Sequence, residues 1–235
     1  MAETVDFERL IPNLYLLNEI QIGDPSQPTA PQQWTTRAGQ LSPYYVSARG
    51  VTGFSRSKRL PVEEQLVTRE MTAAAIGDAL ARQGLPWDHL YGVRQAGTPL
   101  AALVAGGMRR SLLWGRIGVK NHGITTTPVE GNYVPGDSLA LVDNVLTTGG
   151  SADEEATMLE GLGFHIATLG VLVDRSEGGV GNLKARTPSI PVASAITMPD
   201  VVQILNDAGL LHPEQVELAE AYYQSRALPG TTDTA

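Results

Sequence analysis

The stretch LALVDNVLTTGGS, residues 139–151, decides the fold. Its apolar start predicts a buried strand, and Asp143 and Asn144 follow near the carboxyl end of that strand. The loop 147–151 then offers three hydroxyl side chains, and its two glycines let backbone N–H groups turn inward at the start of a helix. This pattern predicts a ribose-phosphate site in which Asp143 accepts from ribose hydroxyls. The alternative is an ordinary strand-to-helix turn that Ser151 caps.

Outward from this stretch, strands and helices alternate. Buried strands are expected at 89–93, 111–117, 138–145, 165–174 and 190–197, with helices at 62–83, 98–110 and 151–163. Such alternation indicates an α/β fold whose parallel sheet is covered on both faces. Ligands of these sheets bind beyond the carboxyl ends of the strands, where residues 143–151 also lie.

The two ends of the chain read differently from this core. The apolar spacing over 5–20 predicts a helix that Pro12 can interrupt, and the proline-rich stretch 21–33 reads as a connector. One or two helices are expected over 199–226, before a disordered tail at 228–235. We therefore divide the chain into an N-terminal helix, linker and hood (1–60), a core (61–210), and a C-terminal helix and tail (211–235).

Composition excludes several classes of protein. The chain has no cysteine, which rules out disulfides and thiolate metal sites and fits a cytoplasmic location. A net charge of −8 disfavours an extended nucleic-acid surface. The N-terminal sequence lacks the apolar core of a signal peptide, and no apolar run approaches the ~20 residues that a membrane span needs. No membrane partner is therefore expected. The one dense basic cluster, Arg56, Lys58 and Arg59, is either a solvated loop or an anion contact.

Residues 139–151 resemble the phosphoribosyl diphosphate (PRPP) motif of type I phosphoribosyltransferases, which has four apolar residues, two acids, two apolar residues and a Thr- and Gly-rich loop. Asn144 stands where that family has its second acid. The resemblance implies the family's fold, a central parallel sheet of about five strands flanked by helices, with a small N-terminal hood. It also implies that PRPP contacts Asp143, Asn144, Val145, Leu146, Thr147, Thr148, Gly149, Gly150 and Ser151.

Two further segments are similar to the orotate branch of that family. WTTRAGQLSPYY (34–45) resembles its N-terminal signature, with Arg37 where Lys is usual, and VLVDRSEGG (171–179) keeps an Arg that contacts the pyrimidine carboxylate. The resemblance assigns Arg37, Tyr44, Tyr45 and Arg175 to orotate. Without it, SPYY reads as a turn entering a strand, and Asp174 and Arg175 as a local ion pair.

The segment GRIGVKNHG (115–123) resembles the mobile catalytic loop of orotate phosphoribosyltransferases, which closes over the diphosphate across a dimer interface. The resemblance makes Arg116, Lys120 and His122 catalytic together with Asp143, since cations stabilise the charge that grows on departing pyrophosphate. Ile117 stands where another Lys is common. The alternative is an ordinary exposed loop.

The segment YGVRQAGTPLA (91–101) occupies the place of the family's pyrophosphate loop. Some orotate enzymes have a Lys where this chain has Ala96, so either Arg94 substitutes for it or the backbone alone contacts pyrophosphate.

The resemblance thus implies transfer of a phosphoribosyl group from PRPP to orotate, a step of pyrimidine and UMP biosynthesis. Mg²⁺ is expected on the diphosphate and ribose hydroxyls, without a protein cage of its own. A homodimer that shares the 115–123 loop between subunits follows as well. Two alternatives stay open: a phosphoribosyltransferase for another base, and a PRPP-binding regulator without turnover.

Overall fold

The computed structural model describes residues 4–26, 33–35, 39, 41–53, 59–116 and 128–226. Arg37, Lys120 and His122, which carry part of the predicted site, lie outside these residues, as does the predicted tail at 228–235. Within the described ranges, no helix is long and apolar enough to cross a membrane.

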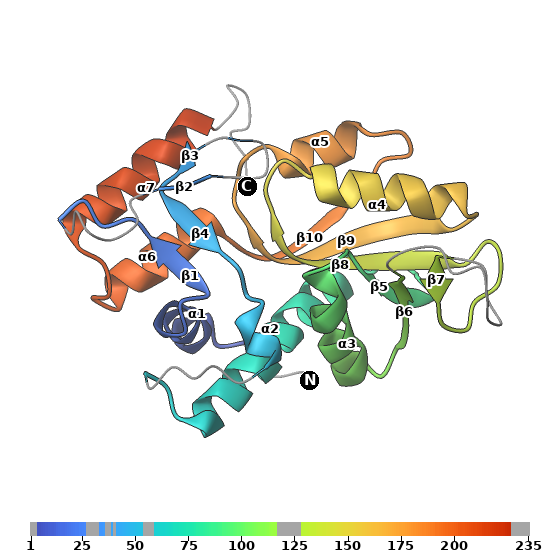
Figure 1. Cartoon of the computed structure of the whole chain (residues 1–235), viewed down its shortest axis with the longest axis horizontal. Coiled ribbons are helices and arrows are strands. Elements are labelled where there is room, and N and C mark those ends of the chain that lie inside the picture. The colour runs from blue at the N-terminus through green and yellow to red at the C-terminus, as the bar shows by residue number, and fades with distance from the viewer. Residues whose placement is uncertain are drawn as a thin grey trace.

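A six-stranded sheet forms the centre of the molecule (Figure 1). Its strands, in spatial order, are β10 (Val192–Thr197), β9 (His165–Asp174), β8 (Ser138–Leu146), β5 (His89–Gly92), β6 (Ser111–Gly115) and β7 (Val129–Glu130). The first five are mutually parallel and confirm the predicted sheet, while β7 adds an antiparallel edge. A strand of two residues is too short to show periodicity, so the sequence did not predict β7.

The order of the parallel strands reverses between β5 and β8. From β5 the chain moves outward to β6, and it returns on the other side of β5 to build β8, β9 and β10 in turn. Loops that leave neighbouring strands at such a reversal diverge to opposite faces, and a crevice opens between them. The loops that follow β5 and β8 are the predicted pyrophosphate loop and the predicted phosphate loop.

Helices cover both faces of the sheet (Figure 1). One face carries α2 (Val62–Gln83) and α3 (Gly97–Met108), and the other carries α4 (Gly150–Gly161) and α5 (Gly179–Ala185). Successive side chains of β8 point to opposite faces of the sheet and contribute to the hydrophobic cluster on each face. Ala140 and Val142 belong to one cluster, and Leu139 and Leu141 belong to the other. The helices predicted over 62–83, 98–110 and 151–163 are confirmed, whereas α5 was not predicted, because a helix of seven residues is too short to show a helical period.

Two helix ends differ in how well they were predicted. The helix predicted over 62–83 ends where expected, because Gly84 follows α2 in a left-handed conformation. The prediction that Ser151 caps the helix after the phosphate loop is wrong. The cap residue is Gly149, with φ of 86°, and α4 begins at Gly150. Because glycine adopts a left-handed conformation without steric cost, Gly149 allows the helix to start earlier, and Ser151 lies within its first turn.

The N-terminal hood consists of α1 (Phe7–Leu16), β1 (Ile20–Ile22), β2 (Trp34–Thr35), β3 (Leu41–Ser42), β4 (Tyr44–Val46) and a 3₁₀ turn (Gly50–Thr52). Pro12 lies within α1 and does not end it. The prediction of a connector over 21–33 missed the end of β1, because this strand pairs with β4, more than twenty residues later.

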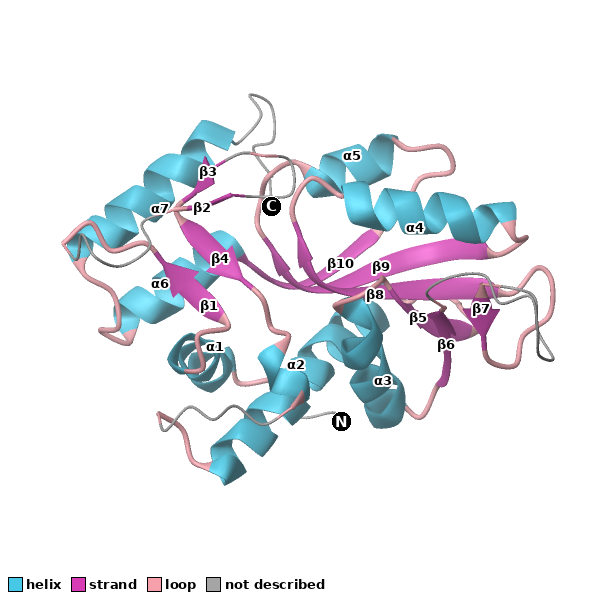
Figure 2. Ribbon diagram, in the orientation of Figure 1, coloured by secondary structure: helices cyan, strands magenta, loops and turns pink. Residues whose placement is uncertain are grey.

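Two C-terminal helices, α6 (Met198–Asp207) and α7 (Pro213–Arg226), confirm the prediction for 199–226. They lie beside the hood rather than apart from it (Figure 2). Gln215 of α7 donates a hydrogen bond of 3.0 Å to the carbonyl of Ile22 in β1. The two ends of the chain therefore build one unit next to the carboxyl edge of the sheet.

Candidate active site

The carboxyl edge of the sheet brings the predicted pyrophosphate loop after β5 against β8, the strand that leads into the predicted phosphate loop. A Cβ added to Gly97 would lie 2.1 Å from the carbonyl oxygen of Val142 in β8, and one added to Gly92 would lie 2.3 Å from the Cα of Thr98. Glycine is therefore required for the turn after β5 to pack this closely on β8. The backbone N–H of Val93 donates to the Val142 carbonyl at 2.9 Å and continues the contact.

The phosphate loop forms a small cavity of about 40 Å³ at the start of α4. Its lining includes Asp143, Val145, Leu146, Thr147, Gly149, Gly150 and Ser151. The positive end of the α4 dipole and the N–H groups of its first turn suit an anion here. The loop is supported from behind by α5, where Asn182 donates to the Thr148 carbonyl at 2.9 Å and a Cβ on Gly179 would meet the Thr147 carbonyl at 2.3 Å.

Asp143 lies at the mouth of this cavity in a desolvated position. Burial raises the pKa of its carboxyl from 3.8 to about 7, although the Asn144 N–H, at 2.8 Å, and the nearby Arg49 favour the charged form. A carboxylate whose pKa is near neutrality gains strongly from a hydroxyl donor. Asp143 is thus suited to accept from ribose hydroxyls.

Asn144, the departure from the family's acidic pair, has a structural partner. Its side chain is buried, and its Nδ2 donates a hydrogen bond to the carbonyl of Ser47 in the hood. An aspartate could not donate to a carbonyl. The amide therefore ties the hood to the end of β8, and Asp143 is left as the acid of the pair.

Arg94 does not extend freely into the crevice. Its Nε lies 2.9 Å from the carboxylate of Glu155 on α4, and the hydroxyl of Tyr91 donates to the same carboxylate at 2.6 Å. Burial, followed by the bond to Glu155, raises the pKa of Tyr91. The contact between Arg94 and Glu155 links the turn after β5 to α4, the helix after the phosphate loop, and so fixes the position of one relative to the other.

The base of the predicted catalytic loop is anchored, while its centre lies outside the described residues. The Arg116 N–H donates to the Pro128 carbonyl at 2.8 Å, and Arg116 Nε lies 2.7 Å from Glu130 of β7. The segment 117–127 therefore begins and ends at one point beside β6. Ile117, Lys120 and His122 belong to that segment.

Arg175 lies at the end of β9 and is 6% exposed. Its Nη2 donates to Ser42 Oγ at 2.7 Å and lies 2.7 Å from Glu177 Oε1. The Arg175 guanidinium lies 4.9 Å from the centre of the Tyr44 ring. The Tyr44 hydroxyl donates to the Arg175 carbonyl at 3.4 Å. The structure thus brings together Tyr44 and Arg175, two of the four residues predicted for the base.

Tyr45 points elsewhere. Adjacent residues of a strand project to opposite faces, and the Tyr45 ring stacks on Trp34 with 6.2 Å between the ring centres. Of the predicted base-binding residues, Tyr45 is therefore not placed with Arg175, and Arg37 lies outside the described part of the chain.

The sequence did not single out four residues that complete the site. Ser42 and Ser47 bond to predicted site residues from the hood, Glu155 binds Arg94, and Tyr222 of α7 packs edge-on against Tyr44 at 5.3 Å between ring centres. Ser42 belongs to the quoted SPYY motif, so a signal existed there. The others are reached through tertiary contacts that no local pattern encodes.

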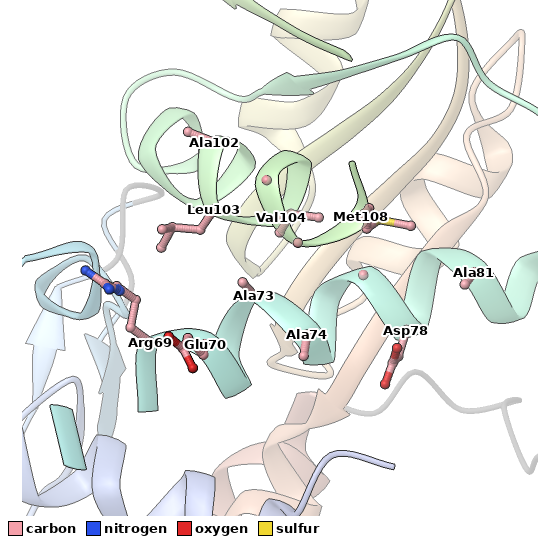
Figure 3. Close-up of a pocket in the computed structure, with 13 residues that line it drawn as sticks. Arg69, Glu70, Ala73, Ala74, Asp78, Ala81, Ala102, Leu103, Val104 and Met108 are labelled. Carbon is pink, nitrogen blue, oxygen red and sulfur yellow. The ribbon is translucent and has the colours of Figure 1, made fainter. Parts of the chain in front are cut away.

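A second, larger groove of about 490 Å³ lies away from this edge, between α2 and α3 (Figure 3). Small residues of α2 such as Ala73 and Ala74 form one side, and Leu103, Val104 and Met108 of α3 form the other. The groove holds none of the predicted site residues. In the described ranges, no three His, Asp or Glu side chains gather as a metal cage.

Comparison with known proteins finds relatives of this chain, although not through family models. No family model matches the chain. It is 30% identical over 191 residues to uridine 5'-monophosphate synthase from Bos taurus, a match that covers 81% of this chain and 37% of that protein. The chain thus spans little more than a third of this relative. It is also 30% identical over 210 residues to orotate phosphoribosyltransferase from Nitrosospira multiformis, which covers 83% of this chain and 84% of that protein.

Among solved structures, orotate phosphoribosyltransferase from Aeropyrum pernix superposes with a TM-score of 0.61 at 25% identity, over 86% of this chain and 99% of that one. The chain therefore belongs to the orotate phosphoribosyltransferase family.

Proposed function

We propose that this chain transfers the phosphoribosyl group of PRPP to orotate, which gives orotidine 5′-phosphate and pyrophosphate, a step of UMP biosynthesis. One observation carries the proposal. The glycine-rich loop at the start of α4, the desolvated Asp143 and the buried Arg175 lie along one edge of the sheet, at the ends of the adjacent strands β8 and β9. That edge offers donors and acceptors that suit a phosphate, a ribose and an anionic base.

In the proposed reaction, the bond between the ribose anomeric carbon and the diphosphate breaks as a nitrogen of the base attacks that carbon. The 147–151 loop holds the 5-phosphate through backbone N–H groups and hydroxyls, and Asp143 orients the ribose. Arg116, Lys120 and His122 are proposed to close on the departing pyrophosphate, where cations stabilise the developing charge. The anchored base of 117–127 beside β6 supports such a closing segment.

Mg²⁺ is proposed to enter with PRPP. The donors around the phosphate loop are N–H groups and hydroxyls, which suit phosphate oxygens, and Mg²⁺ retains waters and prefers to bind phosphates. The metal would neutralise part of the diphosphate charge. The residues of the chain would hold the substrate that carries it.

A homodimer is proposed as well, with the loop 115–123 serving the partner's site. The groove between α2 and α3 supports a second copy, because it is apolar, is edged by charges of both signs, Arg69 and Asp78, and lies next to β6, which leads into that loop. A patch with both signs can pair with itself about a two-fold axis. The cytoplasmic location expected from the sequence stays a prediction.

Purified protein mixed with PRPP, Mg²⁺ and orotate should consume orotate, which is followed by its loss of ultraviolet absorbance. Turnover only with another base would overturn the assignment to orotate. The Lys120→Ala variant should lose at least ~100-fold in kcat and still bind PRPP, since it removes a group that acts mainly in the transition state. A regulator without turnover would bind PRPP, release no pyrophosphate, and be indifferent to this change.

A further inference from the structure

One face of the C-terminal helix α7 lies against the part of the site that holds Arg175. Gln215, Ala219, Tyr222 and Arg226 recur at intervals of four, three and four residues, so they share one face of the helix. Gln215 fastens this face to β1 of the hood, and Tyr222 meets the Tyr44 ring edge-on. The helix that the sequence left without a role is thus part of the wall around Arg175.

Guanidinium groups and aromatic rings alternate through this wall. Arg175 lies 4.9 Å from the centre of the Tyr44 ring, Tyr44 lies 5.3 Å from Tyr222, and the Arg226 guanidinium lies 5.1 Å from the centre of the Tyr222 ring. Such cation–π contacts and edge-to-face packing fix the orientation of each side chain relative to the next. Tyr222, Tyr44 and Arg175 therefore pack in one continuous series of contacts.

Two hydrogen-bond donors in this wall are buried and have no acceptor among the residues that the structure describes. They are the Nε of Arg175 and the hydroxyl of Tyr222. Arg175 as a whole is 6% exposed, and its Nη2 is engaged by Ser42 and Glu177, so Nε is the guanidinium nitrogen that is buried without an acceptor. Buried donors are almost always paired in folded proteins, and an unpaired one points to a ligand that supplies the acceptor.

We propose that Tyr222 is a specificity-determining residue of the base subsite. Its hydroxyl and Arg175 Nε donate to the carboxylate of the pyrimidine, and α7 closes that end of the site. The inference rests on the proposed function. A carboxylate provides two acceptor oxygens for these donors, whereas uracil, which has the same ring without the carboxylate, leaves both unpaired.

The test compares Tyr222→Phe, which removes one oxygen and keeps the ring, with Tyr223→Phe, the matched change at the next residue of α7. For each variant, kcat and KM are measured with orotate, uracil and PRPP. We expect Tyr222→Phe to raise the KM for orotate on the order of 10-fold, because a hydrogen bond to a charged group is lost. In Tyr222→Phe, the KM for PRPP and the low activity with uracil should change less than about twofold. In Tyr223→Phe, the KM for orotate should also change less than about twofold.

An unchanged KM for orotate in Tyr222→Phe would overturn the proposal. So would an equal loss for PRPP and orotate, or the same loss in Tyr223→Phe, since each of these indicates a general structural effect. Calorimetric titration of orotidine 5′-phosphate, well below the unfolding midpoint, tests the same contact without turnover. If wild-type protein used no base at all, the proposed reaction would fail, while weaker nucleotide binding by Tyr222→Phe would still support the subsite.

Discussion

At the scale of single residues, the acidic pair of the PRPP motif has been divided between two tasks. Asp143 keeps the carboxylate in a desolvated position, and Asn144 turns its amide to the Ser47 carbonyl. A second carboxylate at 144 would lack a donor at this carbonyl and would add negative charge beside Asp143. The amide is therefore consistent with a family member that binds ribose through one acid and uses the second position to hold the hood.

The titration of Asp143 gives a prediction for the ligand-free protein. Its pKa is raised from 3.8 to about 7 by burial, so between these pH values the folded chain keeps a proton that the unfolded chain has lost. Stability should therefore fall as pH rises through this window. Because Asp143→Asn lacks this effect, its unfolding free energy relative to wild type should increase between pH 4 and 8, by at most about 4 kcal/mol. Urea unfolding at several pH values measures it.

Asp137, at the opposite edge of the sheet, is the control for that experiment. Hydrogen bonds from the Val134 N–H and from His89 hold the pKa of its carboxyl below the usual range. Its contribution is present above the ordinary pKa and is lost only as pH falls below it, so Asp137→Asn should show the opposite trend, and only below about pH 4. Parallel pH profiles for wild type and Asp143→Asn would contradict the assigned burial of Asp143.

At the scale of elements, the site depends on how closely α3 approaches β8. The turn after β5 packs against the backbone of Val142, and only a residue without a side chain fits at Gly97. On the other side of the phosphate loop, Gly179 lets α5 approach Thr147 in the same way. Glycines that look like generic loop residues in the sequence therefore set how closely α3 approaches β8 and how closely α5 approaches the proposed phosphate loop.

The Gly97→Ala variant tests this spacing. Its Cβ would lie 2.1 Å from the Val142 carbonyl, so α3 must shift away from β8. Overpacking of this kind costs about 1–3 kcal/mol, and we expect a lower unfolding midpoint together with a raised KM for PRPP. Gly161→Ala, at the end of α4, is the control, because its Cβ meets nothing within 4 Å and the change should be neutral or slightly stabilising. Equal behaviour of the two variants would refute the close-approach argument.

At the scale of the whole molecule, both ends of the chain converge on the carboxyl edge of the sheet. The hood contributes Ser42, Tyr44 and Ser47, the core contributes Asp143 and Arg175, and α7 contributes Tyr222. The proposed dimer extends this convergence to a second chain, whose 115–123 loop would complete each site. An active site built in this way depends on assembly as well as on folding.

A shared site predicts that two inactive variants rescue each other. Lys120→Ala lacks a loop residue and Asp143→Asn lacks a core residue, so a mixed dimer would contain one site with both intact. After unfolding and joint refolding at equal amounts, random pairing should restore up to about a quarter of wild-type activity. Refolding each variant by itself is the control. No activity beyond that of the separate variants would argue against a loop shared between subunits.

Local patterns were sufficient for the parallel sheet, its main helices and the phosphate loop, because strand and helix periodicity and the glycines of 147–151 act over neighbouring residues. The same holds for the order of the family motifs. Tertiary structure decided that Asn144 faces the hood, that Arg94 pairs with Glu155, that Tyr44 rather than Tyr45 joins Arg175, and that Tyr222 lies beside them. These contacts join residues at least 61 positions apart in the chain. Their partners are selected by burial and by the need to pair buried polar groups, which no short window of sequence contains.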